Sequence, residues 1–156
     1  FEWHIIGYKE DSKWCKIAQS EKMLKIRDYP FVFHGRLDAV ELSNALLESD
    51  IYVHVSHIEN SPNSVGEAML VGLPVIASFA GGTSSILRDG VDGILVQDGD
   101  PYVLAGSIVN LLNHPELALR YSENAKESAR RRYCPKQVYQ ELLEGYNQIM
   151  VDYYIK

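Results

Sequence analysis

Short apolar runs alternate with helical patterns from residue 3 to residue 96 of this chain. The runs are rich in β-branched and aromatic residues and are mostly apolar on both faces, as in strands of a covered parallel sheet. This alternation predicts an α/β fold built on a doubly wound parallel sheet with right-handed crossovers. We expect its strands at residues 3–8, 31–34, 51–56, 74–78 and 93–96.

Helical patterns separate the first four of these strands and make up the chain beyond the last one. Asp98 and Asp100 precede the first of the later helices as candidate caps, with a proline at its first position. No internal repeat or low-complexity linker is evident, so we predict a single domain over residues 1–156 with a helical C-terminal segment. The expected helices are 11–28, 39–48, 64–71, 101–112, 115–132 and 136–152.

The composition is that of an ordinary soluble globular protein, with 46% apolar and 23% charged residues. A net charge of −6 argues against nucleic acid as a partner, and the basic cluster Arg130-Arg131-Arg132 reads as cations near a helix C-terminus. Cys15 and Cys134 have neither metal-ligand spacing nor the pattern of a disulfide framework, which favours a reducing cytosol. We find no transmembrane segment and no signal peptide.

Two carboxylates lie at the junction of an expected strand and helix. Glu59 and Glu67 have seven residues between them, and a helix beginning near Asn63 places Glu67 about one turn inside it. The loop follows strand 51–56, at the carboxyl end where doubly wound sheets bind ligands. First-turn N–H groups favour an anion such as pyrophosphate, and carboxylates accept hydrogen bonds from the paired hydroxyls of sugars. The combination predicts a nucleotide-sugar site.

The pattern of Glu, seven residues, Glu, Ala and then Gly-x-Pro-Val runs from Glu59 to Val75. It closely resembles the donor-binding motif of retaining glycosyltransferases with the GT-B fold, of the glycosyltransferase family 4 type. Gly81-Gly82 and the stretch from Asp89 to Val96 follow in the order that this family shows. The resemblance covers roughly residues 31–113, and more loosely the remainder to the C-terminus. It implies the Rossmann-like C-terminal half of a GT-B fold.

The same resemblance implies roles for individual residues. Glu67 matches the residue that makes a bidentate contact with the ribose hydroxyls of the donor nucleotide. Glu59 matches the residue that reaches the donor sugar near its anomeric carbon, where it positions the sugar and supports an oxocarbenium-like transition state without a covalent role. Gly35-Arg36-Leu37 matches the segment that contacts the nucleotide base, largely through its main chain.

The residues between the two glutamates depart from the commonest family pattern, which is Gly-aromatic-Gly after the first Glu. Here the stretch is Asn60-Ser61-Pro62-Asn63-Ser64, in which Pro62 has no N–H to donate. We expect Asn63 or Ser64 to cap the helix and the N–H groups near Ser64 and Val65 to face the phosphates. Asn60 and Ser61 are also candidate donor contacts. Some members of the capsular and lipopolysaccharide branch resemble this version.

Other elements of the sequence carry less functional weight. The glycines of Gly81-Gly82 are most simply required by backbone conformation, and Ser84-Ser85 stands where the family usually has Pro-Glu. His54 and His57 lie where a strand gives way to a loop, and no carboxylate pattern completes a metal triad. We therefore expect no metal and no cofactor, with a UDP-, GDP- or ADP-sugar as the donor substrate.

The expected function is the nucleotide-sugar-binding half of a retaining glycosyltransferase in bacterial surface polysaccharide or glycolipid biosynthesis. We expect a cytoplasmic enzyme at the inner face of the membrane, in peripheral contact with it. The family's diphosphate-clamping Arg and Lys, and the domain that binds a glycan or glycolipid acceptor, are expected to precede Phe1, so the chain is read as a fragment that is inactive alone.

Three alternatives share the fold or the site. The paired glutamates favour transfer over a sugar-nucleotide epimerase, and the lack of a lysine for pyridoxal phosphate opposes a glycogen phosphorylase. A non-catalytic nucleotide-sugar-binding module with a decayed site is opposed by the intact Glu59 and Glu67.

Overall fold

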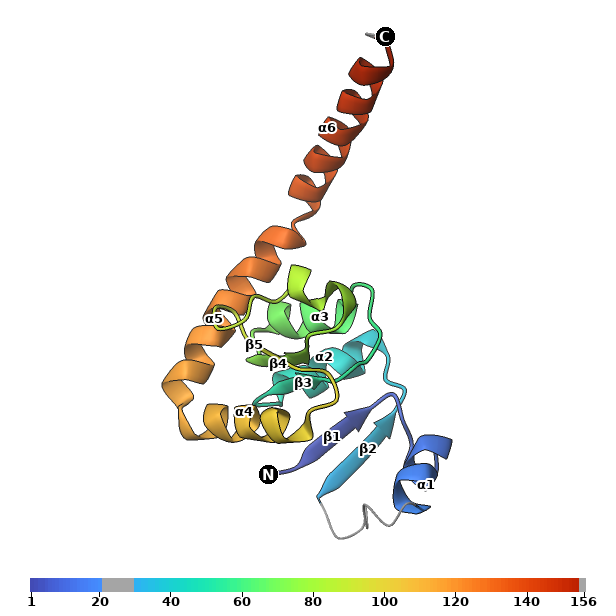
Figure 1. Ribbon diagram of the computed structural model, residues 1–156, viewed down its shortest axis with the longest axis vertical. Helices are drawn as coiled ribbons and strands as arrows, with labels where there is room; N and C mark the ends of the chain where they lie inside the picture. The colour runs from blue at the N-terminus through green and yellow to red at the C-terminus, as the bar shows by residue number, and fades with distance from the viewer. Residues whose placement is uncertain (21–29, 155–156) are drawn as a thin grey trace. The chain divides into compact units, whose positions relative to one another are not determined.

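The computed structural model describes residues 1–20 and 30–154 of the chain (Figure 1). Contacts between these residues divide the chain into two compact units, Phe1–Ala45 and Leu46–Lys156. The single domain that the sequence predicts over residues 1–156 stays a prediction. Each unit contains a parallel sheet, which confirms the predicted α/β class.

The first unit contains a parallel pair of strands, β1 (Trp3–Ile6) and β2 (Phe31–Gly35). β1 is shorter than the expected strand 3–8 because the chain turns at Gly7, whose φ is +95°. α1 (Lys13–Ser20) follows β1, and the part of the expected helix 11–28 that falls on residues 21–29 lies outside the described residues. After β2 comes α2 (Ala39–Leu47).

The second unit contains three parallel strands in the order β3-β4-β5. Their bounds are Tyr52–His54, Val75–Ser78 and Ile94–Val96, each within the strand that the sequence predicts. β4 lies between the other two strands, and all four of its residues are buried. A central strand that is apolar on both faces needs cover on both sides.

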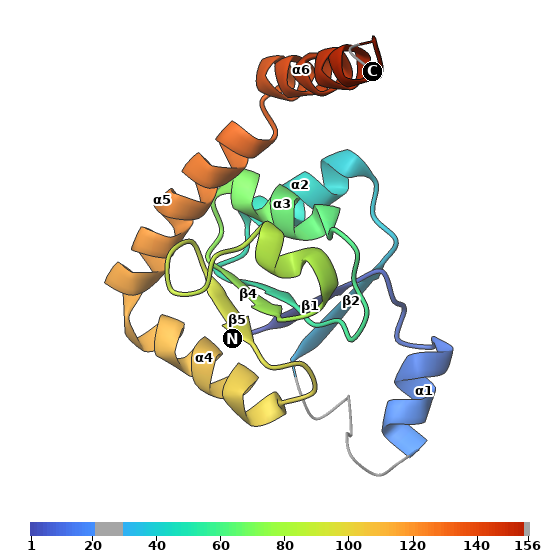
Figure 2. The same ribbon diagram turned by 45° about the horizontal axis from the view of Figure 1, so that its top comes forward.

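Helices cover both faces of this three-stranded sheet. α3 (Asn63–Val71) lies on one side and α4 (Pro101–Asn113) on the other, and α5 (Pro115–Arg132) packs against both helices (Figure 2). Ile76 of β4 packs with Leu111 of α4 and Tyr121 of α5. Because side chains alternate along a strand, Val75 and Ala77 point to the opposite face, toward α3.

The helix ends follow local rules that the sequence predicts. Asp100 caps α4, since its Oδ1 accepts the N–H groups of Tyr102 and Val103, each at 3.0 Å. Gly72 ends α3 in the left-handed region at a φ of +95°, where a side chain would be strained. The cluster Arg130-Arg131-Arg132 occupies the last turn of α5, as expected.

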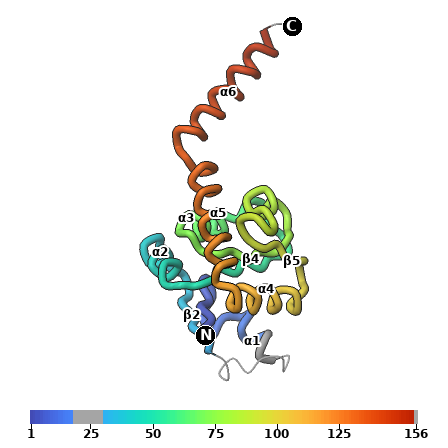
Figure 3. The backbone as a smooth tube through the Cα atoms, turned by 90° about the vertical axis from the view of Figure 1, so that its left-hand side faces the viewer, coloured from blue at the N-terminus to red at the C-terminus, as the bar shows by residue number. Residues whose placement is uncertain are grey.

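The C-terminal helix α6 (Pro135–Tyr154) has no buried residue. Figure 3 shows it leading away from the end of α5. Within the described residues, no helix is both long enough and apolar enough to cross a membrane.

Replacing Asp100 by Ala should lower the free energy of unfolding by about 1 kcal/mol, because two N–H groups of α4 lose their acceptor. The measurement is urea denaturation followed by circular dichroism. Asp100→Asn keeps a capping oxygen and should stay close to the wild type. Equal stability of Asp100→Ala and Asp100→Asn would show that this cap does not stabilise α4.

Candidate functional site

The two motif carboxylates lie where the sequence predicts. Glu59 is on the loop between β3 and α3, and Glu67 is on α3, just over one turn from its first residue, Asn63. Both therefore lie beyond the carboxyl end of β3, at the edge of the sheet where ligands bind in folds of this class.

The loop that carries Glu59 packs directly on Gly81 and Gly82, the first residues of the 3₁₀-helix η2 (Gly81–Ser85). A Cβ added to Gly81 would lie 1.6 Å from the carbonyl oxygen of Glu59, and one added to Gly82 would lie 1.8 Å from that of Asn60. The Gly82 N–H donates to the Glu59 carbonyl at 3.4 Å. Only glycine allows the two segments to approach so closely. This reason for the two glycines could not be seen in the sequence.

Both oxygens of the Glu59 carboxylate have protein partners. Oε2 lies 3.2 Å from Nε2 of His54, at the end of β3, and Oε1 accepts the N–H of Asn60 at 3.3 Å. The Glu59 side chain is 23% exposed. A carboxylate has about four acceptor positions, so Glu59 can still accept hydrogen bonds from ligand hydroxyls.

Two polar side chains of β3 lie on the face of the sheet next to the motif. Tyr52 and His54 pair in register with Val75 and Ala77, so their side chains lie on the sheet face that α3 covers. Burial raises the pKa of the Tyr52 hydroxyl, a hydrogen bond with Ser64 lowers it, and the charges of Glu67 and Glu59 raise it.

Tyr52 is a neighbour of the motif through its hydrogen bond with Ser64, on the first turn of α3. Sequence reasoning missed Tyr52 as a neighbour of the site and considered His54 only as a metal ligand. The available signal was the spacing of two along β3, which puts both polar side chains on one face.

The start of α3 corrects one expectation. Neither Asn63 nor Ser64 caps the helix; the N-cap is Pro62, with a φ of −69° and no side-chain capping bond. The Pro62 carbonyl accepts the N–H of Val65 at 3.2 Å and that of Gly66 at 3.5 Å. The ring of Pro62 already fixes the φ that starts this turn, and the Ser64 side chain is hydrogen-bonded to Tyr52 instead.

This arrangement shows which N–H groups at the start of α3 are free to donate to a phosphate. The Val65 N–H already donates to the Pro62 carbonyl, and the Val65 side chain is buried. Asn63 and Ser64 provide the first two N–H groups of α3, which have no intrahelical partner. The side chains of Asn60 and Ser61 are exposed on the preceding loop. The roles of these residues toward a ligand stay predictions.

The residues expected to contact a nucleotide base belong to the first unit. Gly35 ends β2 with a φ of +69°, and its N–H donates to the Tyr8 carbonyl at 3.1 Å. Arg36 is exposed and Leu37 is half-buried directly after the strand. Their role also stays a prediction.

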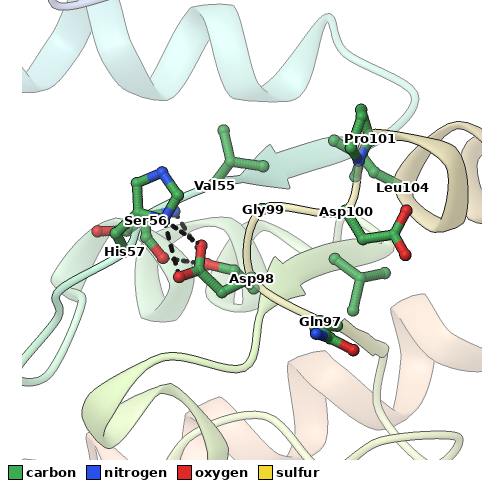
Figure 4. Close-up of a pocket in the computed structure, with 11 residues that line it drawn as sticks. Val55, Ser56, His57, Gln97, Asp98, Gly99, Asp100, Pro101 and Leu104 are labelled. Atoms are coloured by element: carbon green, nitrogen blue, oxygen red, sulfur yellow. Dashed lines mark hydrogen bonds and ion pairs between the residues drawn. The ribbon is translucent and has the colours of Figure 1, made fainter.

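A separate cavity of about 360 Å³ lies at the carboxyl ends of β3 and β5 (Figure 4). At its edge His57 and Asp98 face one another, with Nδ1 of the imidazole 2.6 Å from Oδ1 of the carboxylate. Across residues 1–20 and 30–154, no three His, Cys, Asp or Glu side chains gather as they would around a metal ion. His57 lines this cavity, whereas His54, at the end of β3, contacts the Glu59 carboxylate.

Comparison with known proteins gives one family match. Residues 2–128 match the family described as Glycosyl transferases group 1. The N-acetyl-alpha-D-glucosaminyl L-malate synthase of Bacillus anthracis is 29% identical over 140 residues, which cover 90% of this chain and 36% of that protein. The GDP-mannose-dependent alpha-mannosyltransferase of Mycolicibacterium smegmatis is 32% identical over 120 residues, 76% of this chain and 31% of that protein. The chain thus spans about a third of the length of these two relatives.

Solved structures give the same fold. Anabaena Alr3699/HepE in complex with UDP has a TM-score of 0.81 at 23% identity, covering 94% of this chain and 41% of that one. The complex of the same protein with UDP-glucose gives 0.80 at 21% identity, with the same coverage. This likeness confirms the predicted Rossmann-like C-terminal half of a GT-B fold.

Gly82→Ala should lower the free energy of unfolding by about 1–3 kcal/mol, because the new methyl group forces the Glu59 loop away from η2. Gly106→Ala is the matched control: its Cβ would meet nothing within 4 Å on α4. The control should be neutral or stabilising by up to about 1 kcal/mol. Chemical denaturation of both variants measures the difference, and a Gly82→Ala variant as stable as the control would contradict the close contact.

Proposed function

Because the chain belongs to the family Glycosyl transferases group 1, we propose that it is the donor-binding half of a retaining glycosyltransferase of the family 4 type. The observation that carries the proposal is the placement of Glu59 and Glu67 on either side of the start of α3. Carboxylates on both sides of free helix-terminal N–H groups suit a ligand with a diphosphate between two polyhydroxylated rings.

The donor occupies this site in three parts. The diphosphate accepts hydrogen bonds from the N–H groups of Asn63 and Ser64, where the helix dipole favours negative charge. The exposed Glu67 accepts from the ribose hydroxyls, and Glu59 accepts from hydroxyls of the donor sugar.

The chemistry needs charge stabilisation at two places. As the bond from the sugar to the diphosphate lengthens, positive charge grows near the anomeric carbon, where the Glu59 carboxylate lowers its energy. Negative charge grows on the leaving diphosphate, where the helix N–H groups lower its energy. Glu59 forms no covalent bond in this proposal, and neither a metal nor a cofactor is required.

The first donor to test is a UDP-sugar, since the fold is shared with a protein solved with UDP and with UDP-glucose. A GDP-sugar is the next, because one relative is named for GDP-mannose, and an ADP-sugar is the third. We propose that the acceptor is a glycan or glycolipid held by another part of the enzyme. The proposed setting is bacterial surface polysaccharide or glycolipid assembly on the cytoplasmic side of the membrane.

Glu67→Gln should weaken UDP binding by about 1–3 kcal/mol, because the amide offers weaker and mismatched hydrogen bonds to the ribose hydroxyls. Titration calorimetry on the 156-residue chain measures the change. Glu123→Gln, an exposed glutamate on α5, is the matched control and should bind as the wild type does. Unchanged UDP affinity in a folded Glu67→Gln variant would remove Glu67 from the site.

Glu59→Ala should separate the two ends of the donor. UDP lacks the donor sugar that Glu59 contacts, so its affinity should stay within about twofold of the wild type, whereas UDP-glucose should bind about tenfold more weakly. The two titrations are run side by side. Equal losses for UDP and UDP-glucose would contradict the assigned division between Glu59 and Glu67.

A further inference from the structure

The side chain of His54 makes a contact that the donor-site motif does not account for. Its Nε2 lies 3.2 Å from Oε2 of Glu59, and both side chains are largely buried, with 17% of His54 and 23% of Glu59 exposed. A carboxylate oxygen only accepts, so His54 donates from Nε2–H in this contact. A charge-assisted hydrogen bond in a partly buried setting is stronger than one on the surface.

The location of His54 makes this contact more than local packing. On the α3 face of the sheet, its register partner in β4 is Ala77, which is fully buried and apolar. An apolar side chain at His54 would satisfy the packing there without needing a hydrogen-bond partner. The imidazole has its partner in Glu59, beyond the end of the strand, and thereby ties the loop to β3.

The contacts of Glu59 divide into main-chain and side-chain contacts. Gly82 holds its carbonyl, which places the loop, and Asn60 donates to Oε1 from the neighbouring peptide. Neither contact fixes the direction of the carboxylate from outside the loop. Among the described residues, His54 provides the side-chain hydrogen bond to that carboxylate.

We propose that His54 is a positioning residue for the donor sugar, because it holds the Glu59 carboxylate in the orientation that accepts the sugar hydroxyls. This inference rests on the proposed function of Glu59. It predicts that loss of the imidazole affects the sugar end of the donor and leaves the nucleoside diphosphate end unchanged. A histidine that only packs in the sheet would affect both ends equally or neither.

The first test measures the affinity of the 156-residue chain for UDP and for UDP-glucose in three variants. His54→Leu removes the donor and should weaken UDP-glucose about tenfold while leaving UDP within about twofold. His54→Gln supplies an N–H donor of similar reach and should recover most of the UDP-glucose affinity. His57→Leu is the matched control: His57 is 80% exposed, pairs with Asp98 and should leave both affinities unchanged.

Unchanged UDP-glucose affinity in folded His54→Leu, an equal loss for both ligands, or no recovery in His54→Gln would each overturn the proposal. A second measurement needs no ligand: imidazole ¹⁵N–¹H spectra of the wild type and of Glu59→Gln. The His54 signals should shift and those of His57 should not. Unshifted His54 signals overturn the contact itself.

If the wild-type chain binds neither UDP nor UDP-glucose, the proposed function is wrong, and so is the positioning role of His54. The shifted imidazole signals would then still report the contact with Glu59. The two failures are therefore distinguishable.

Discussion

The direct packing of the Gly81-Gly82 main chain on the Glu59 loop is the constraint on which the candidate site depends. No side chain fits between the two segments, since a Cβ on either glycine would overlap a carbonyl oxygen of Glu59 or Asn60. The loop after β3 is thus fixed by the segment after β4, a neighbouring strand of the same sheet. Loops held in this way keep functional side chains in place without a rigid element of their own.

The sheet also supports both segments of the motif. Tyr52 and His54 share one face of β3, and each is hydrogen-bonded to a different part of the motif, Ser64 on α3 and Glu59 on the loop. A buried polar group needs a partner, so each of these bonds also holds its motif segment against the strand. Polar contacts from β3 thereby hold the motif, while Val75 and Ala77 of β4 pack as buried apolar side chains on the α3 face of the sheet.

Much of this arrangement could be predicted from the sequence because it depends on local patterns. The five strands, the cap at Asp100, the helix end at Gly72 and the place of Glu67 on α3 all follow from neighbouring residues. Residues 21–29 lie outside the described part of the chain, so the expected helix 11–28 is tested only in part.

The contacts that complete the site could not be predicted in the same way. The approach of Gly82 to Asn60 depends on how the loops after two strands meet in space. The hydrogen bond from His54 to Glu59 depends on the direction that the loop takes after β3. Residue preference predicts Asn63 or Ser64 as the cap of α3, but Pro62 takes that position and Ser64 is hydrogen-bonded to Tyr52. Tertiary contact overrides local preference at each of these places.

We propose that one ligand spans both motif carboxylates, with the nucleoside at Glu67 and the donor sugar at Glu59. A crystal structure of the chain with UDP-glucose tests it most directly. We expect ribose hydroxyls on Glu67, glucose hydroxyls on Glu59 and the diphosphate at the first N–H groups of α3, each at about 2.6–3.2 Å. Density for UDP-glucose in the cavity beside His57 and Asp98, with Glu59 and Glu67 free of ligand, would contradict it.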